Sequence, residues 1–209
     1  EQIGAHRQAL CIVNTRSAAR ELYRRTRAWV EEDGLYHLSA RMCPKHRLKK
    51  LKEIRERLDS KQPCILISTQ LVECGVDVDF PVVYRELAGL DSIAQAAGRC
   101  NRNNRMEKNG RPELGITYVF ETEDTAKLRG WFRTTADVTR SVVERHADDP
   151  LSPEAVEDYF RQLYFFQTLG DRQDLTDKYE ILKQLNKGKL QDCAFPFRTV
   201  AEQFRLIDT

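Results

Sequence analysis

Three residues near the middle of the chain have the types and spacing needed to act on a transferred phosphoryl group. Gln95, Arg99 and Arg102 are spaced i, i+4 and i+7, so on a helix they would present an amide and two guanidinium groups on one face. A planar guanidinium group matches the oxygens over which charge spreads during phosphoryl transfer. We predict that a helix beginning near Asp91 carries all three. The alternative for the two arginines is a set of ordinary surface ion pairs.

A second polar cluster follows an apolar stretch that is typical of a buried strand. Ser68 and Thr69 lie at the carboxyl end of that stretch, where hydroxyl and backbone N–H groups could hold a phosphate. Gly75 permits a close backbone approach or a positive φ angle. Asp77 could accept a hydrogen bond from a ribose hydroxyl or orient an arginine. A turn that uses Gly and Asp in their usual roles is an equally good explanation.

Two further polar segments end the first two apolar stretches of the chain. Asn14 and Thr15 follow the first, and Arg41 follows the second. Because the carboxyl ends of parallel strands meet at one edge of a sheet, we expect these three residues to share that edge with Ser68 and Thr69. Helix capping is the commoner role for Asn14 and Thr15 and remains the alternative.

Five short apolar runs rich in β-branched residues predict the strands that position these groups. They are Ala9–Val13, Leu35–Leu38, Cys64–Ser68, Val82–Arg85 and Ile116–Phe120. Amphipathic helices are predicted over Ser17–Glu31, with Trp29 on the apolar face, and over Lys45–Leu58, with Leu48 on the apolar face. Strands that alternate with helices indicate an α/β fold, with a mostly parallel sheet flanked by helices.

The chain becomes helical and acidic after the last of these strands. The predicted helices are Thr122–His146, Pro153–Thr168 and about Thr176–Leu185. Ser152 should cap the second of them, with Pro153 in its first turn. We therefore divide the chain into an α/β domain over residues 1–148 and a C-terminal helical extension over residues 149–209.

Charge along the chain is uneven although the net charge of the 209 residues is only +2. Residues 41–61 contain nine basic residues against three acidic ones, and residues 99–111 contain five against one. This asymmetry fits a surface that faces a polyanion. A solvated helix face is an equally good explanation for residues 41–61 taken alone.

The cysteines and histidines do not form a metal-binding pattern. The six cysteines occur without a C-x-x-C pair, and the four histidines are isolated from one another. We expect reduced thiols and no metal site. The sequence has no run of eighteen apolar residues and no signal-peptide pattern at its start, so we expect a cytoplasmic protein that does not enter a membrane.

The order of these segments over residues 8–120 resembles the second RecA-like motor lobe of superfamily 2 helicases. Asn14 and Thr15 match motif IV, Thr69 through Asp77 resembles motif V, and Gln95 through Arg102 resembles motif VI with its Q-x-x-G-R-x-x-R pattern. The resemblance implies that Asn14, Thr15 and Thr69 touch the sugar-phosphate backbone of a single DNA strand. We add Arg41 and Ser68 to this nucleic-acid-binding set.

For the nucleotide, the resemblance implies ATP as cofactor. Gly75 and Asp77 would lie near ATP, and Arg99 and Arg102, with Gln95, would act on its γ-phosphate. The chain has no G-x-x-x-x-G-K-[ST] loop and no D-E-x-[HD] quartet, so the phosphate cradle and Mg²⁺ are expected on another lobe. We expect no cofactor on this chain alone, and no ATP hydrolysis by it.

A narrower resemblance is to the CRISPR-associated helicase-nucleases of type I systems. It is carried by residues 68–80, by Gly98-Arg99-Cys100-Asn101-Arg102, and by the segment Phe195–Asp208. It implies as partners an N-terminal RecA-like lobe and a nuclease domain of the same protein, and an RNA-guided surveillance complex. Two alternatives remain open: a lobe of an RNA or DNA-repair helicase of another superfamily 2 branch, and a module that docks a protein partner or inhibitor.

Overall fold

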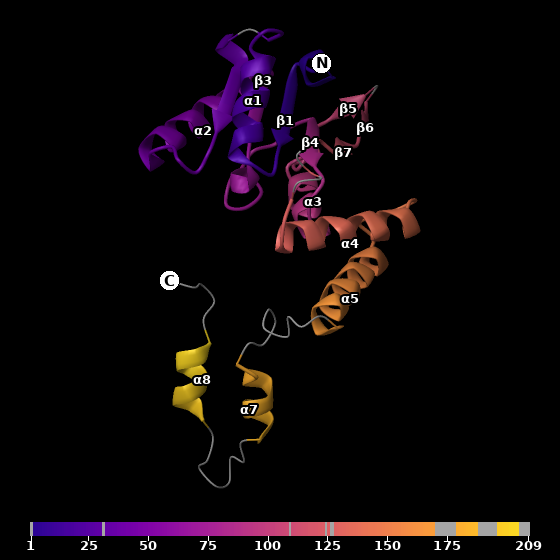
Figure 1. The fold of residues 1–209 in the computed structure, drawn as a ribbon. Helices are drawn as coiled ribbons and strands as arrows, with labels where there is room; N and C mark the ends of the chain where they lie inside the picture. Colours follow the sequence, from indigo (N-terminus) through magenta and orange to yellow (C-terminus); the bar gives the residue numbers. More distant parts are fainter. Residues whose placement is uncertain are drawn as a thin grey trace. The chain divides into compact units, whose positions relative to one another are not determined.

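The first part of the chain is built on a five-stranded parallel sheet (Figure 1). The computed structural model describes residues 2–30, 32–108, 110–123, 125, 128–169, 179–187 and 196–204. The strands are β1 (Gln8–Ile12), β2 (Leu35–Leu38), β3 (Cys64–Ser68), β4 (Val82–Glu86) and β7 (Ile116–Phe120), in the order β2-β3-β1-β4-β7. All four pairings are parallel. The five predicted strands and the parallel sheet are confirmed.

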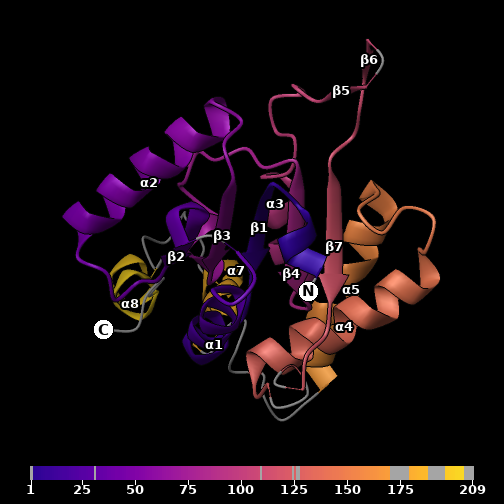
Figure 2. The ribbon, with the colours of Figure 1, turned by 90° about the horizontal axis from the view of Figure 1, so that it is seen from above.

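Helices cover both faces of this sheet, because the residues of each strand alternate between the two faces. Leu10 of β1 packs in the cluster that contains Ile54 of α2 (Pro44–Asp59) and Ala96 of α3 (Leu90–Ala97). Cys11, its neighbour in β1, packs in the cluster that contains Ala19 of α1 (Arg16–Thr26). Figure 2 shows α2 and α1 on opposite sides of the strands.

Two predicted helices differ from the structure at one end. α1 ends at Thr26 and not at Glu31; Trp29 lies beyond it and is 68% exposed, so its predicted place on the apolar face is wrong. Helix α4 (Trp131–Arg145) begins after Gly130, whose φ is +58°, and not at Thr122. Within α2, Leu48 is 67% exposed and does not join the core.

The remaining elements lie between these strands and in the C-terminal part. Short 3-10 helices span Gln2–Ala5, Glu32–Gly34 and Gln70–Val72. A two-stranded antiparallel hairpin, β5 (Glu107–Lys108) and β6 (Arg111–Pro112), projects from the sheet (Figure 2). The last helices are α5 (Pro153–Leu169), α7 (Ile181–Lys187) and α8 (Phe197–Gln203). No helix of the described residues is long and apolar enough to cross a membrane.

The chain divides into two compact units, Glu1–Val156 and Glu157–Thr209. The predicted division after residue 148 stays a prediction. Helix α5 begins where predicted, and the Ser152 Oγ accepts from Ala155 N at 3.2 Å as a helix cap. Of the predicted helix near Thr176–Leu185, residues 176–178 lie outside the described residues, as do residue 195 and residues 205–208 of the C-terminal segment.

Candidate functional site

A groove of about 710 Å³ lies at the carboxyl edge of the sheet, beside the loops that follow β1, β2 and β3. It is lined by Asn14, Thr15, Arg16, Ser17, Arg20, His37, Ser39, Ala40, Arg41, Thr69 and Gln70. None of these residues is acidic. The parallel topology therefore brings Asn14, Thr15, Arg41 and Thr69 together, as the sequence predicted.

Three arginines give this groove its charge. Arg16, Arg20 and Arg41 are exposed, and within the described part of the chain they make no ion pair or hydrogen bond through their side chains, so their guanidinium groups face solvent. Arg16 and Arg20 were missed by the sequence reasoning. The signal was present, because a helix that starts directly after β1 must place its first turns at the carboxyl edge, and residues four apart share one face of a helix.

Thr15 and Asn14, at the edge of the groove, form hydrogen bonds within the protein. Thr15 is the N-cap of α1, where its Oγ1 accepts from Ala18 N at 3.1 Å, so the capping alternative is confirmed for Thr15. The Asn14 amide donates to the Leu87 carbonyl oxygen at 2.8 Å and accepts from Arg85 Nη1 at 2.8 Å. Both ends of the Asn14 side chain therefore have a protein partner, and its predicted contact with DNA stays a prediction.

Ser68 is fully buried, and its hydroxyl donates to the Leu38 carbonyl oxygen at 3.3 Å. Its predicted contact with DNA is wrong for the side chain, because that side chain is 0% exposed and does not line the groove. Thr69, one residue further, is nearly buried at the floor of the groove.

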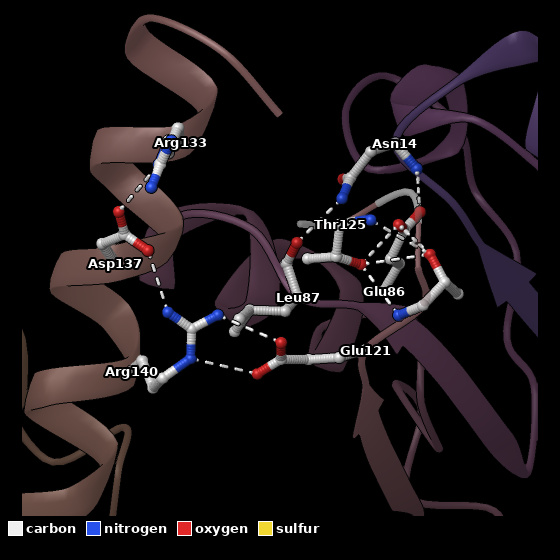
Figure 3. Close-up of polar contacts among 9 residues, drawn as sticks. Asn14, Glu86, Leu87, Glu121, Thr125, Arg133, Asp137 and Arg140 are labelled. Atoms are coloured by element: carbon white, nitrogen blue, oxygen red, sulfur yellow. Dashed lines mark hydrogen bonds and ion pairs between the residues drawn. The ribbon is translucent and has the colours of Figure 1, made fainter. Parts of the chain in front are cut away.

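A buried polar network supports the loops that carry the groove (Figure 3). The Glu86 carboxylate accepts from Asn14 N at 2.7 Å, from Thr122 Oγ1 at 2.9 Å and from Thr125 Oγ1 at 2.8 Å. These contacts tie the end of β4 to the segments that follow β1 and β7. They also explain why helix α4 does not begin at Thr122 as predicted, because Thr122 and Thr125 donate hydrogen bonds to Glu86 and lie outside that helix.

A second anchor fixes α4 to the end of β7. The Arg140 guanidinium donates from Nε and Nη2 to both carboxylate oxygens of Glu121, at 3.1 and 3.0 Å, and from Nη1 to Asp137 at 2.8 Å (Figure 3). The hydrogen bonds to Glu121 and Asp137 raise the pKa of Arg140. A two-pronged contact of this kind sets the orientation of a helix as well as its position.

Beneath the groove lies an ion pair that is almost wholly inaccessible to solvent. Arg85 Nε and Glu73 Oε1 are 2.7 Å apart, and the side chains are 0% and 5% exposed. Burial lowers the pKa of Arg85 and raises the pKa of Glu73, and the opposite charge of each partner acts against that change. The pair joins β4 to the loop that follows β3.

The prediction that one helix carries Gln95, Arg99 and Arg102 is wrong. Helix α3 ends at Ala97, and residues 98–103 form a turn, which we call the arginine turn. Cys100 pairs with Phe80 in an isolated parallel bridge, and Asn101 has a φ of +43°. Pairing with Phe80, which precedes β4, thus ends the helix before Arg99 and Arg102, so that α3 carries only Gln95 of the three predicted residues, and Gln95 is exposed.

The two arginines of this turn make different contacts. Arg99 donates from Nε to the Val72 carbonyl oxygen at 3.0 Å and from Nη2 to that of Glu73 at 2.7 Å. Arg102 Nη1 lies 3.3 Å from Asp77 Oδ1, and the side chains are 44% and 77% exposed. Asp77 therefore contacts an arginine, which is one of the two roles predicted for it. Gly75 has a φ of +70°, as the sequence also allowed.

The structure separates the predicted nucleotide residues from the predicted nucleic-acid residues. Asp77 lines a cavity of about 290 Å³ together with Gln8, the first residue of β1. Asn14, which lines the groove, lies just beyond the last residue of β1. Six residues of strand span roughly 20 Å, so the two sets occupy opposite ends of the sheet and Arg99 lies on the connection between them.

Metal-binding residues are not gathered in the described part of the chain, where no group of three His, Cys, Asp or Glu side chains could hold an ion. Five of the cysteines are unpaired thiols, while Cys193 lies outside the described residues. Burial raises the pKa of Cys11 to about 12 and that of Cys64 to about 12. These two thiols behave as small apolar core residues.

Comparison with known proteins shows which family this arrangement resembles. The model of "CRISPR-associated nuclease/helicase Cas3, C-terminal" matches residues 5–105. A Cas3 nuclease/helicase of Methanothermobacter thermautotrophicus is 27% identical over 163 residues, which are 76% of this chain and 19% of that protein. A Cas3 of Haloferax volcanii is 47% identical over 98 residues, which are 46% of this chain and 10% of that protein.

Solved structures share the fold. The crystal structure of T. fusca Cas3-ATP superimposes with a TM-score of 0.58 and 23% identity, over 84% of this chain and 22% of that one. A chain of a CRISPR RNA-guided surveillance complex in a pre-nicking state gives a TM-score of 0.53 and 21% identity, over 85% of this chain and 23% of that one. These likenesses confirm the predicted RecA-like α/β class. Over residues 5–105 the chain is thus similar to the C-terminal part of the CRISPR-associated Cas3 nuclease/helicases.

Proposed function

We propose that this chain is the second motor lobe of an ATP-dependent helicase that moves along single-stranded DNA during CRISPR interference, an antiviral defence. The observation that carries the proposal is the groove at the carboxyl edge. Arg16, Arg20 and Arg41 face solvent there without an ion pair in the described part of the chain, and none of the residues lining the groove is acidic. An uncompensated cluster of guanidinium groups favours a polyanion.

The chemistry of the groove suits the backbone of a nucleic acid. Its donors are guanidinium groups and the hydroxyl-bearing side chains of Ser17, Ser39 and Thr69, which bind phosphate oxygens and carry no sequence information. Its lining contains no Trp, Tyr or Phe on which a base could stack. Binding should therefore tolerate any sequence and weaken with salt, as translocation along DNA requires.

Arg102 is the residue best placed to act on ATP held by a neighbouring lobe. Within the described residues its side chain pairs with Asp77, which is well exposed, and an exposed ion pair of this kind is weak because water and salt screen it. A γ-phosphate held by the neighbouring lobe could therefore replace Asp77 as the partner of the Arg102 guanidinium group. Arg99 fits a positioning role better, since two backbone carbonyls already hold it.

The bound nucleotide would supply the phosphoryl group whose transfer drives movement. We assign Mg²⁺ to the neighbouring lobe, because the sequence has no G-x-x-x-x-G-K-[ST] loop and no D-E-x-[HD] quartet. The proposal extends to an N-terminal RecA-like lobe and nuclease domain in the same protein and to a surveillance complex as partner. Support for the last comes from the likeness to a chain of a CRISPR RNA-guided surveillance complex.

Arg102→Ala in the full-length protein tests this assignment. An arginine acting across a cleft contributes roughly 10³–10⁵ in rate, so we expect single-stranded-DNA-stimulated ATP hydrolysis to become undetectable while DNA binding stays within threefold of the wild type. Arg105→Ala is the matched control, because Arg105 is an exposed arginine of the same region that pairs with Asp59 at 3.2 Å. Retained turnover in the Arg102→Ala protein would refute the role of Arg102.

A further inference from the structure

We infer that Glu73 and Arg85 are positioning residues that hold the arginine turn and the nucleic-acid groove in one rigid unit, so that DNA in the groove stimulates ATP hydrolysis. The inference rests on the proposed function. It concerns two side chains that touch neither DNA nor ATP in that proposal, since Arg85 is 0% exposed and Glu73 is 5% exposed.

The pair contacts the arginine turn through the backbone of Glu73. Arg99 Nη2 donates to the Glu73 carbonyl oxygen at 2.7 Å, and Arg99 Nε donates to the Val72 carbonyl oxygen at 3.0 Å. The side chain of the same Glu73 is held by Arg85 at 2.7 Å. Any movement of Glu73 relative to the sheet therefore moves the carbonyl groups that hold Arg99.

The pair contacts the groove through Arg85. Arg85 Nη1 donates to Asn14 Oδ1 at 2.8 Å, and Asn14 immediately precedes Thr15, the cap of α1, whose first turns carry Arg16 and Arg20. Gln70 of the groove donates to the Asn14 carbonyl oxygen at 3.3 Å. A continuous set of polar contacts thus runs from Arg99 through Glu73, Arg85 and Asn14 to the groove.

Stability alone does not account for a buried pair of this kind. The free-energy cost of removing two charges from water is often larger than the gain from their attraction. Apolar residues of similar volume often stabilise a core as well or better. Arg85 Nη2 is also buried without a hydrogen-bond partner in the described part of the chain, which adds to the cost. Unlike apolar side chains, a charged pair has directional contacts, which are satisfied in only one arrangement of the two segments.

The consequence is a coupling between the two ends of the sheet. With the pair intact, DNA that orders the loop carrying Asn14 and the start of α1 also fixes the Val72–Glu73 backbone and hence Arg99. Without the pair, the groove and the arginine turn each keep their own residues but lose their common anchor. DNA in the groove then no longer raises the rate of ATP hydrolysis above its basal value.

The test measures ATP hydrolysis by the full-length protein with and without single-stranded oligo-dT. The variants are Glu73→Gln, which removes the charge, and the double variant Glu73→Leu with Arg85→Met, which removes the pair without leaving one charge unpaired. We expect the ratio of DNA-stimulated to basal rate to fall at least tenfold in both. Glu53→Gln is the matched control, because Glu53 pairs with Lys50 at 2.7 Å on the partly exposed face of α2.

Thermal unfolding of each variant separates positioning from folding. A double variant that melts within a few degrees of the wild type but has lost stimulation supports the inference. A double variant that keeps the wild-type ratio within twofold overturns it, whatever its melting temperature, and leaves the proposed function intact. A wild-type protein that DNA does not stimulate overturns the proposed function itself, and the inference with it.

Discussion

Salt dependence of DNA binding gives the sharpest test of the groove. Arg16, Arg20 and Arg41 line it without an ion pair in the described residues, so a strand that fills it should meet three guanidinium groups. Each phosphate contact with single-stranded DNA contributes about 0.7 to the slope of log affinity against log salt. Three contacts give a slope of about −2, which weakens binding roughly twentyfold between 50 and 200 mM salt.

Replacing one of these arginines should remove one contact. For Arg20→Ala the slope should become about −1.4, and the loss between the same two salt concentrations should shrink to about sevenfold. Fluorescence anisotropy of labelled oligo-dT with this chain, titrated at four or more salt concentrations, measures the slope. Arg24→Ala is the matched control, because Arg24 lies on the same helix, pairs with Glu21 at 2.9 Å and does not line the groove.

The reasoning is refuted if Arg20→Ala and Arg24→Ala have the same slope. It is also refuted if the slope of the unaltered chain is close to zero, because the three arginines would then face no phosphate. A slope that depends on which base is repeated in the oligonucleotide would contradict backbone recognition, since phosphate contacts carry no sequence information.

Two further predictions concern the fold around the groove. Thr15→Ala should destabilise the protein by about 1 kcal/mol in urea unfolding, because α1 loses its cap, whereas Thr15→Ser keeps the hydroxyl and should stay close to the wild type; equal losses in both variants would contradict the capping role. Cys43 and Cys74 are exposed and should react with a thiol reagent at pH 8, while Cys11 and Cys64, each with a pKa raised to about 12 by burial, stay protonated and should react only after unfolding. Mass spectrometry of the labelled peptides distinguishes the four sites, and fast labelling of Cys11 in the folded protein would show that β1 is not in the core.

The sequence alone determined the elements whose signals are local. Val, Ile and Leu runs such as Cys64–Ser68 are typical of buried strands, and their alternation with amphipathic stretches indicates parallel pairing. The parallel arrangement in turn places the residues after each strand on one edge. For that reason Thr15, Arg41 and Thr69 were predicted to lie together, and they do.

The tertiary structure alone decided what each of those side chains does. Asn14 and Ser68 carry small polar side chains, as Thr69 does, but the Asn14 amide contacts Arg85 and Leu87, and the Ser68 hydroxyl donates to the Leu38 carbonyl oxygen. Partners so distant along the chain leave no periodic signal, and hydrogen bonds form with whatever group the fold brings near.

Helix α3 illustrates the same limit. The spacing of Gln95, Arg99 and Arg102 fits a helix, but the pairing of Cys100 with Phe80 ends α3 at Ala97. The buried pair of Glu73 and Arg85 was likewise invisible, because charged residues twelve positions apart look like surface residues until strand β4 and the loop after β3 are packed together. Sequence determines which segments must be buried. Only the packed fold determines which polar groups meet, since that depends on the three-dimensional neighbours that burial creates.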